Sequence, residues 1–153
     1  MPKAGETDEA RAVVDDVVRN CLAVRLRRLN RVVSSVYDKA LRSAGIKISQ
    51  MNILVAAGKM GLARPAELCR LLDLDVSTLS RNVERMRAKG WLEVVEESDA
   101  RFHPCRVTPQ GRQLLSDAYP AWQAAQKKAA EILGREGVAF LKQSVSLGPR
   151  QAD

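Results

Sequence analysis

The sequence predicts a mainly α-helical protein with one small β-hairpin. Apolar residues recur at steps of three and four along most of the chain, and glycines or prolines stand where such stretches begin or end. In 62–111, two short helices joined by a tight turn precede two strand-like segments with a charged turn between them. This order is typical of a winged helix-turn-helix lobe, and the longer helices on either side predict a helical arm.

The composition limits the classes of protein to which this chain can belong. The 153 residues suffice for one small domain with an added arm, and a net charge of +7 favours a polyanionic partner. No apolar run approaches the roughly 20 residues of a membrane span, and no apolar signal core follows the first residues. Cys21, Cys69 and Cys105 are odd in number and far apart, which suits a reducing cytoplasm. We therefore expect a cytoplasmic protein with no membrane partner.

A long first helix is predicted from Asp8 to Ser43. Its apolar stripe, at steps of three and four, comprises Val14, Val18, Leu22, Leu26, Leu29, Val33, Val36 and Ala40. Gly45 follows in the position that glycine favours past a helix end. A helix of this length exceeds what one small lobe can cover, so it needs a partner, either a second chain or the C-terminal helix.

The next two helices are short. Ser49 is the predicted N-cap of a helix over 50–59. A third helix begins near Arg64, with Pro65 in its first turn, where a missing amide donor costs nothing. The buried side of this third helix comprises Leu68, Leu71 and Leu72.

The fourth helix, 76–89, has Asp75 as its N-cap and is stopped by Gly90. At 100° per residue, one side is apolar and is assigned to the core: Val76, Leu79, Val83 and Met86. The opposite side carries two hydroxyls, two arginines and a small residue: Ser77, Thr78, Arg81, Arg85 and Ala88. Such a face suits a major groove, because hydroxyls reach phosphates or bases and arginine forks onto guanine. A solvated face would explain this helix taken alone, but the short link at 72–76 favours a helix-turn-helix.

A β-hairpin follows, with strands at 91–96 and 103–107 and the turn EESDAR between them. Pro104 keeps the return strand at an edge or makes it irregular. Asp99 would hold the turn while Arg101 projects, and an arginine on a thin hairpin can enter a minor groove. An ordinary charged turn is the alternative. The predicted DNA-contacting residues are thus Ser77, Thr78, Ser80, Arg81, Arg85, Asp99 and Arg101.

Thr108 and Pro109 begin a last long helix as N-cap and first-turn residue. A heptad-like seam continues along it through Leu115, Ala118, Trp122, Ala125, Ala129 and Ile132. Gly134 and Gly137 should interrupt it before a short final helix marked by Val138, Leu141 and Val145. We accordingly predict a helical dimerisation region over 8–46 and 109–147 and a DNA-binding lobe over 47–108.

Two segments resemble the multiple antibiotic resistance regulator (MarR) family of bacterial transcription factors. LDVSTLSRNVERMRAKGW resembles the family's recognition helix, and DARFHPCRVTPQG its wing, in which Asp99, Arg101, Thr108 and Gly111 fall at the family's spacing. The resemblance covers about 22–132. It implies a homodimer whose first, fifth and last helices interlock, and a palindromic double-stranded DNA operator. It also implies a repressor that is relieved by a small molecule or an oxidant.

The chain departs from the family in two respects. Ala63 stands where the family often has a helix-capping Thr or Ser. Aromatic residues are few, so the sequence defines no effector-binding residues beyond the candidates Tyr37, Tyr119 and Trp122.

Alternatives to effector-relieved repression stay open. Cys21, near the cation Arg25, fits an oxidant-sensing thiol, although a small residue on the apolar stripe is the simpler interpretation. Arg25, Arg28 and Arg31 line a cleft for an anionic effector or form a solvated face. A winged-helix protein-assembly module would need an acidic or apolar outward face on the fourth helix, which here is basic. The single His103, the absence of a CxxC pair and the lack of catalytic motifs predict no metal, no cofactor and no enzyme.

Overall fold

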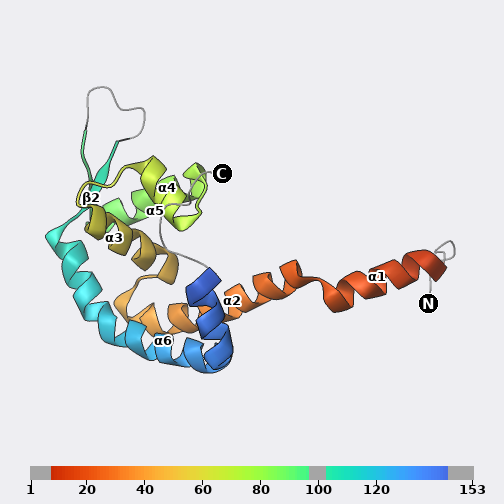
Figure 1. The fold of residues 1–153 in the computed structure, drawn as a ribbon. Coiled ribbons are helices and arrows are strands. Elements are labelled where there is room, and N and C mark those ends of the chain that lie inside the picture. Colours follow the sequence, from red (N-terminus) through yellow and green to blue (C-terminus); the bar gives the residue numbers. More distant parts are fainter. Residues whose placement is uncertain (1–7, 97–102, 145–153) are drawn as a thin grey trace. The chain divides into compact units, whose positions relative to one another are not determined.

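The structure is a computed structural model that describes residues 8–96 and 103–144. The chain divides into two compact units, Met1–Ser35 and Val36–Asp153, each of which is described by itself. The elements, labelled in Figure 1, are α1 (Asp8–Asn20), α2 (Leu22–Ala40), η1 (Leu41–Ala44), α3 (Ile48–Met60), α4 (Pro65–Leu72), α5 (Val76–Ala88), β1 (Leu92–Val94), β2 (Cys105–Val107) and α6 (Pro109–Ser144). The predicted fold class, mainly α with a small β-hairpin, is confirmed. None of the described helices combines the length and the apolar character that a membrane span requires.

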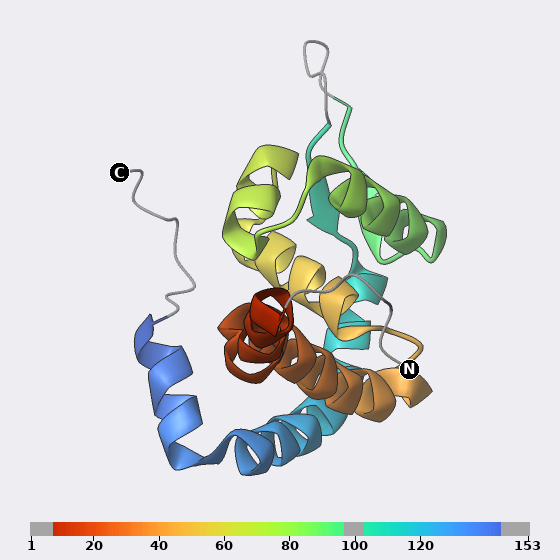
Figure 2. The same cartoon turned by 90° about the vertical axis from the view of Figure 1, so that its right-hand side faces the viewer.

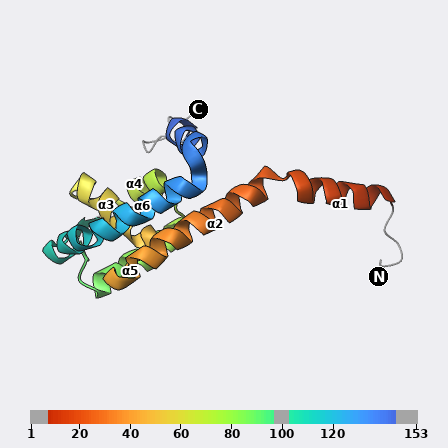
Figure 3. The same ribbon diagram turned by 90° about the horizontal axis from the view of Figure 1, so that it is seen from below.

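In the first unit, the prediction of one uninterrupted helix from Asp8 is wrong. The helix breaks at Cys21, between α1 and α2, as Figure 3 shows. The Arg25 guanidinium donates to the Arg19 carbonyl, so a side chain takes an acceptor that a backbone amide would bind in an unbroken helix. No residue of α1 is buried, so packing does not straighten the break.

In the second unit, η1 ends at Gly45, whose φ of 68° is the left-handed conformation predicted for it. The next helix starts earlier than predicted, because its N-cap is Lys47 and not Ser49. Two side chains satisfy its first amides: Asp38 Oδ1 accepts from the Ile48 N–H at 2.8 Å, and Gln50 Oε1 accepts from the Lys47 N–H at 3.2 Å. The Asp38 carboxylate comes from α2, so no local pattern revealed this cap.

Helices α4 and α5 form the predicted helix-turn-helix. The turn is made by Asp73, whose φ is 52°, and by the Leu74 N–H, which donates to the Cys69 carbonyl at 3.0 Å. Ala63 is fully buried, and its backbone exchanges two hydrogen bonds with Cys105, at 2.8 and 2.9 Å. The N-cap of α4 is Arg64, so Ala63, where the family often has a capping Thr or Ser, does not cap the helix but joins the segment before α4 to the hairpin.

The hairpin strands are shorter than predicted. β1 and β2 pair antiparallel with Leu92 opposite Val107 and Val94 opposite Cys105. Pro104 is fully buried and its carbonyl accepts from the Val95 N–H at 2.8 Å, an irregular continuation of the ladder. The predicted tip residues Asp99 and Arg101 lie outside the described residues.

The α6 helix begins as predicted. Thr108 Oγ1 accepts from the Gly111 N–H at 3.0 Å and donates to the Gly90 carbonyl at 2.6 Å. The helix is broken at Gly134, with φ of 69° and ψ of 170°, and Figure 2 shows the two parts running in different directions. Gly137 lies within the final helical part, so the prediction that it interrupts the helix is wrong. Val145 lies outside the described residues.

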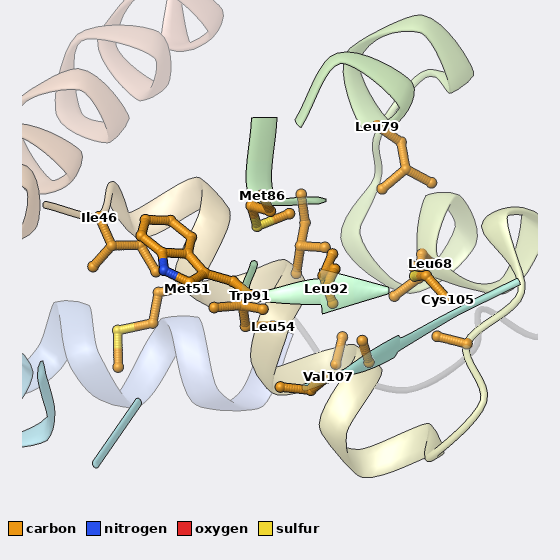
Figure 4. Close-up of a cluster of buried hydrophobic side chains, with 14 of the residues drawn as sticks. Ile46, Met51, Leu54, Leu68, Leu79, Met86, Trp91, Leu92, Cys105 and Val107 are labelled. Atoms are coloured by element: carbon orange, nitrogen blue, oxygen red, sulfur yellow. The ribbon is translucent and has the colours of Figure 1, made fainter. Parts of the chain in front are cut away.

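The core lies between α3, α4, α5 and the hairpin, as Figure 4 shows. Its fully buried large side chains include Leu41, Ile53, Leu54, Leu68, Leu79, Met86 and Leu92. Val76 was assigned to this core, but its side chain is 49% exposed because it stands in the first turn of α5. The core fixes one side of α5 and leaves the other side to solvent.

Candidate nucleic-acid interface

The outward face of α5 contains the predicted contact residues. Leu79 and Met86 are buried, whereas Ser77, Ser80, Arg81, Arg85 and Ala88 are exposed and Thr78 is half-buried. The angular assignment from the sequence therefore separates the two sides of this helix correctly apart from Val76. Ser80 lies at an apolar pocket of about 220 Å³ between α4, α5 and the hairpin strands.

Asp75 organises the start of this face. Its Oδ1 accepts from Ser77 Oγ at 2.5 Å and from the Thr78 N–H at 2.7 Å, and its Oδ2 accepts from Thr78 Oγ1 at 2.7 Å. The hydrogen bonds from Ser77 and then Thr78 hold the pKa of Asp75 far below its usual range. The carboxylate is thus ionised, and it fixes the directions of both hydroxyls.

Arg81 continues this network along the helix. Its Nε donates to the Ser77 carbonyl at 3.1 Å, and its Nη2 donates to Ser77 Oγ at 3.2 Å. One edge of the guanidinium is therefore held by Ser77, and the terminal edge, with Nη1 and the second Nη2 hydrogen, has no acceptor among the described residues. A planar edge with two donors matches the O6 and N7 acceptors of guanine.

The remaining cations of α5 differ in their surroundings. Arg87 forms an exposed ion pair with Glu84 at 3.5 Å. Arg85, one turn after Arg81, has no acidic partner among the described residues. At the base of the hairpin, Arg106 pairs with Glu93 across the two strands at 2.5 Å. Arg85 is therefore the second α5 cation available for an anionic partner.

The three cysteines lie in different environments. Cys21 is partly exposed at the break between α1 and α2. Burial raises the pKa of Cys105, and burial followed by the charge of Asp75 raises the pKa of Cys69. Both latter thiols are therefore less reactive than a free cysteine, as expected for structural residues.

Sequence reasoning missed a contact at the end of α5. Lys89 Nζ donates to the Gly45 carbonyl at 3.0 Å and lies 4.4 Å from the centre of the Trp91 ring. This contact ties the end of α5 to the turn before α3. The only signal in the sequence was a lysine two residues before a tryptophan, which is too common to predict a contact.

Comparisons with known proteins agree with this geometry. A family model described as MarR family matches residues 44–101. The M. tuberculosis transcriptional regulator MOSR, solved in complex with DNA, is 30% identical, with 82% of this chain and 96% of that chain covered and a TM-score of 0.69. The chain belongs to the MarR family of transcriptional regulators. The MarR proteins of Salmonella typhimurium and Salmonella typhi are 27% identical over 101 residues, covering 63% of this chain and 70% of each relative.

Two further solved structures share the fold. A MarR mutant from E. coli complexed with operator DNA is 20% identical, with 84% of this chain and 94% of that chain covered and a TM-score of 0.73. CouR from Rhodococcus jostii RHA1, bound to p-coumaroyl-CoA, is 20% identical, with 88% and 97% covered and a TM-score of 0.72. Family membership makes this chain a DNA-binding transcriptional regulator and not an enzyme.

Proposed function

We propose that this regulator is a homodimeric repressor of a palindromic operator, with α5 in the major groove and the wing in the adjacent minor groove. The observation that carries the proposal is the network from Asp75 through Ser77 to Arg81 on the exposed side of α5. It fixes an arginine fork on a helix whose other side is locked in the core. The related MOSR was solved in complex with DNA, which supports DNA as the partner of this chain.

Each predicted contact residue has a defined part in this proposal. Arg81 presents its terminal edge to a guanine, and Arg85 reaches a base or a phosphate one turn later. Ser77, Thr78 and Ser80 lie close enough to the helix start to contact phosphates. Asp99 and Arg101 are proposed to form the wing contact on the strength of their spacing, and the Glu93–Arg106 pair holds β1 and β2 together.

Dimerisation follows from apolar surface that neither unit covers by itself. In the first unit, the exposed apolar side chains include Val13, Val14, Val17, Val18, Leu22 and Leu26. In the second unit, α6 exposes Tyr119, Ile132, Phe140 and Leu141. Apolar surface on this scale marks an interaction site, and a second copy of 8–46 and 109–147 is the proposed partner.

Relief by a small-molecule effector is the proposed regulation, and it is supported by CouR, a protein of this fold that is bound to p-coumaroyl-CoA. Each aromatic candidate makes a contact within the protein, although Tyr119 is half exposed. Trp122 packs against the core with Tyr119 stacked on it at 5.8 Å, and the Tyr37 hydroxyl donates to Gln126. The effector's chemistry is therefore not assigned to these residues.

Oxidant sensing by Cys21 is a second candidate. The observation that favours it is the position of this partly exposed thiol at a helix break, where a bulkier oxidised sulfur would alter the angle between α1 and α2. Peroxide should then release DNA from the wild-type protein and not from Cys21→Ser. Equal release from both proteins would exclude Cys21 as the sensor.

The central test is a selection of double-stranded DNA from a random library with the full-length protein, followed by light scattering of the free protein. A palindromic consensus and a mass of twice 16.9 kDa are expected. An unpaired half-site bound by a monomer would contradict the dimeric arrangement, and failure to enrich any sequence would contradict the proposed function.

A further inference from the structure

A groove runs beside α5 where this helix faces the start of α3. Its volume is about 540 Å³, and its lining consists of Gly45, Lys47, Ser49, Gln50, Asn82, Arg85, Ala88 and Lys89. Three of these residues are cations, and none carries a carboxylate. We call this site the basic groove. It is separate from the apolar pocket at Ser80, since the two share no lining residue.

One positive charge of the basic groove is held in place. Lys89 donates to the Gly45 carbonyl at 3.0 Å and rests on the face of Trp91. These contacts already restrict the side chain of Lys89. Binding of an anion there therefore costs little further conformational entropy. Arg85 and Lys47, by contrast, are exposed and free to move toward an anion.

The first turn of α3 adds hydrogen-bond donors. The Ile48 N–H is taken by Asp38 and the Lys47 N–H by Gln50, but the Ser49 N–H has no acceptor within its own helix. Gln50 is only 7% exposed, and its Oε1 is occupied. Gln50 also lines the basic groove, and among the described residues no fully buried side-chain nitrogen or oxygen lacks a partner. Unused donors at a positive helix end favour an anion.

We propose that the basic groove seats a phosphate of the DNA backbone beside the bases that α5 contacts. The inference rests on the proposed DNA-binding mode. A helix with its side chains is roughly 10–12 Å wide and the major groove is about 12 Å wide, so the flanks of an inserted helix meet the phosphates that border the groove. Arg85 belongs both to the outward face of α5 and to the basic groove, which makes the two surfaces continuous. Lys47, Ser49 and Lys89 thereby become DNA-contacting residues.

The first test compares Lys47→Gln with Lys59→Gln, since the two exposed lysines stand at opposite ends of α3 and only Lys47 lines the basic groove. Affinity is measured against salt for the selected operator and for an unrelated duplex of equal length. Lys47→Gln should reduce the slope of log affinity against log salt by about one unit per subunit, and weaken both duplexes by the same factor. Lys59→Gln should match the wild type.

The second test introduces a negative charge into the basic groove. Ser49→Glu places a negative charge at the start of α3, which favours the helix but repels a phosphate. Its melting temperature should equal or exceed that of the wild type while DNA affinity falls, and Ser116→Glu, at an exposed serine of α6, should leave affinity unchanged. If Ser49 had only a structural role, Ser49→Glu would stabilise the helix and leave DNA affinity unchanged. That result would contradict the proposal.

The outcomes separate this inference from the function on which it rests. If Arg81→Ala weakens operator binding while Lys47→Gln and Ser49→Glu bind both duplexes like the wild type, the basic groove is not a phosphate seat. Inorganic phosphate that raises the wild-type melting temperature but not that of Lys47→Gln, with equal DNA affinity for both, would assign the groove to a free anion and overturn the proposal. A wild type that binds neither duplex would overturn the proposed function and this inference with it.

Discussion

The helices α3 and α5 begin in physically different ways. The start of α5 is local, since Asp75 caps the helix and binds Ser77 and Thr78 within three residues of itself. The start of α3 is assembled from a distance, because Asp38, ten residues upstream on α2, accepts from Ile48. A local cap can be recognised from the order of residues, whereas a tertiary cap depends on where the fold brings a carboxylate.

The largest expected effect comes from removing Arg81, the last residue of the hydrogen-bond network that begins at Asp75. Arg81→Ala should weaken operator binding by roughly 1–3 kcal/mol for each base that the arginine reads, because the fork on α5 disappears. Unfolding should be unaffected, since Arg81 is exposed and bonded only within its own helix. Arg87→Ala, an exposed arginine paired with Glu84, is the control and should retain affinity. Fluorescence anisotropy with the selected operator measures both variants, and wild-type affinity in Arg81→Ala would refute the assignment.

The start of α4 offers a second contrast between local and tertiary determinants. A local interpretation, which takes position 63 as the cap, would improve this helix by Ala63→Thr, although the N-cap in the structure is Arg64. The structure predicts destabilisation instead, by about 1–3 kcal/mol, because Ala63 is fully buried and bridged to the hairpin, so Thr would place a larger and polar side chain in the core. Ala66→Thr, on the exposed side of α4, is the matched control. Urea unfolding at one protein concentration would decide, and a more stable Ala63→Thr would show that the local cap dominates.

The sequence could predict the elements that depend on neighbouring residues. The Asp75 cap, the Thr108–Pro109 start of α6, and the breaks at Gly45 and Gly134 all follow from hydrogen bonds or φ values set within one turn. It could not predict the Asp38–Ile48 cap, the Ala63–Cys105 bridge or the Lys89–Gly45 contact, which join residues ten or more positions apart in the chain. The exposed face of α5 was predictable because helical periodicity separates its buried from its exposed side chains. The basic groove was not, because it is formed by α5 together with the start of α3.

Acid should weaken the local cap of α5. The pKa of Asp75 in the folded protein lies far below the roughly 3.9 of a free aspartate, so its stabilisation is complete above about pH 4 and is lost as the pH falls toward the folded value. Asp75→Asn cannot titrate there. The stability difference between the wild type and this variant should therefore narrow as the pH falls from about pH 4 to about pH 3, as measured by urea unfolding. A difference that stayed constant over this range would mean that the carboxylate is not responsible for the cap.

Removing the tertiary cap should cost less than filling the Ala63 site. Asp38→Ala leaves the Ile48 N–H without its acceptor, and removal of such a cap typically costs about 1 kcal/mol. The effect should appear as a lower urea midpoint with an unchanged m-value, since the unfolded surface is the same. A midpoint equal to that of the wild type would show that Gln50 and water satisfy the start of α3 without Asp38.

The smallest change in the free energy of unfolding is expected at Ser49, although a local interpretation would predict the largest change there. Ser49 has the residue type of an N-cap, yet it lies inside α3, is exposed, and leaves capping to Asp38 and Gln50. Ser49→Ala should therefore change the free energy of unfolding by less than about 0.5 kcal/mol, as is usual for surface substitutions away from a cap. Measured beside Asp38→Ala, it distinguishes the two ways of starting a helix, because a serine cap would reverse the order of the two destabilisations. A destabilisation by Ser49→Ala greater than that by Asp38→Ala would return the cap of α3 to the local sequence.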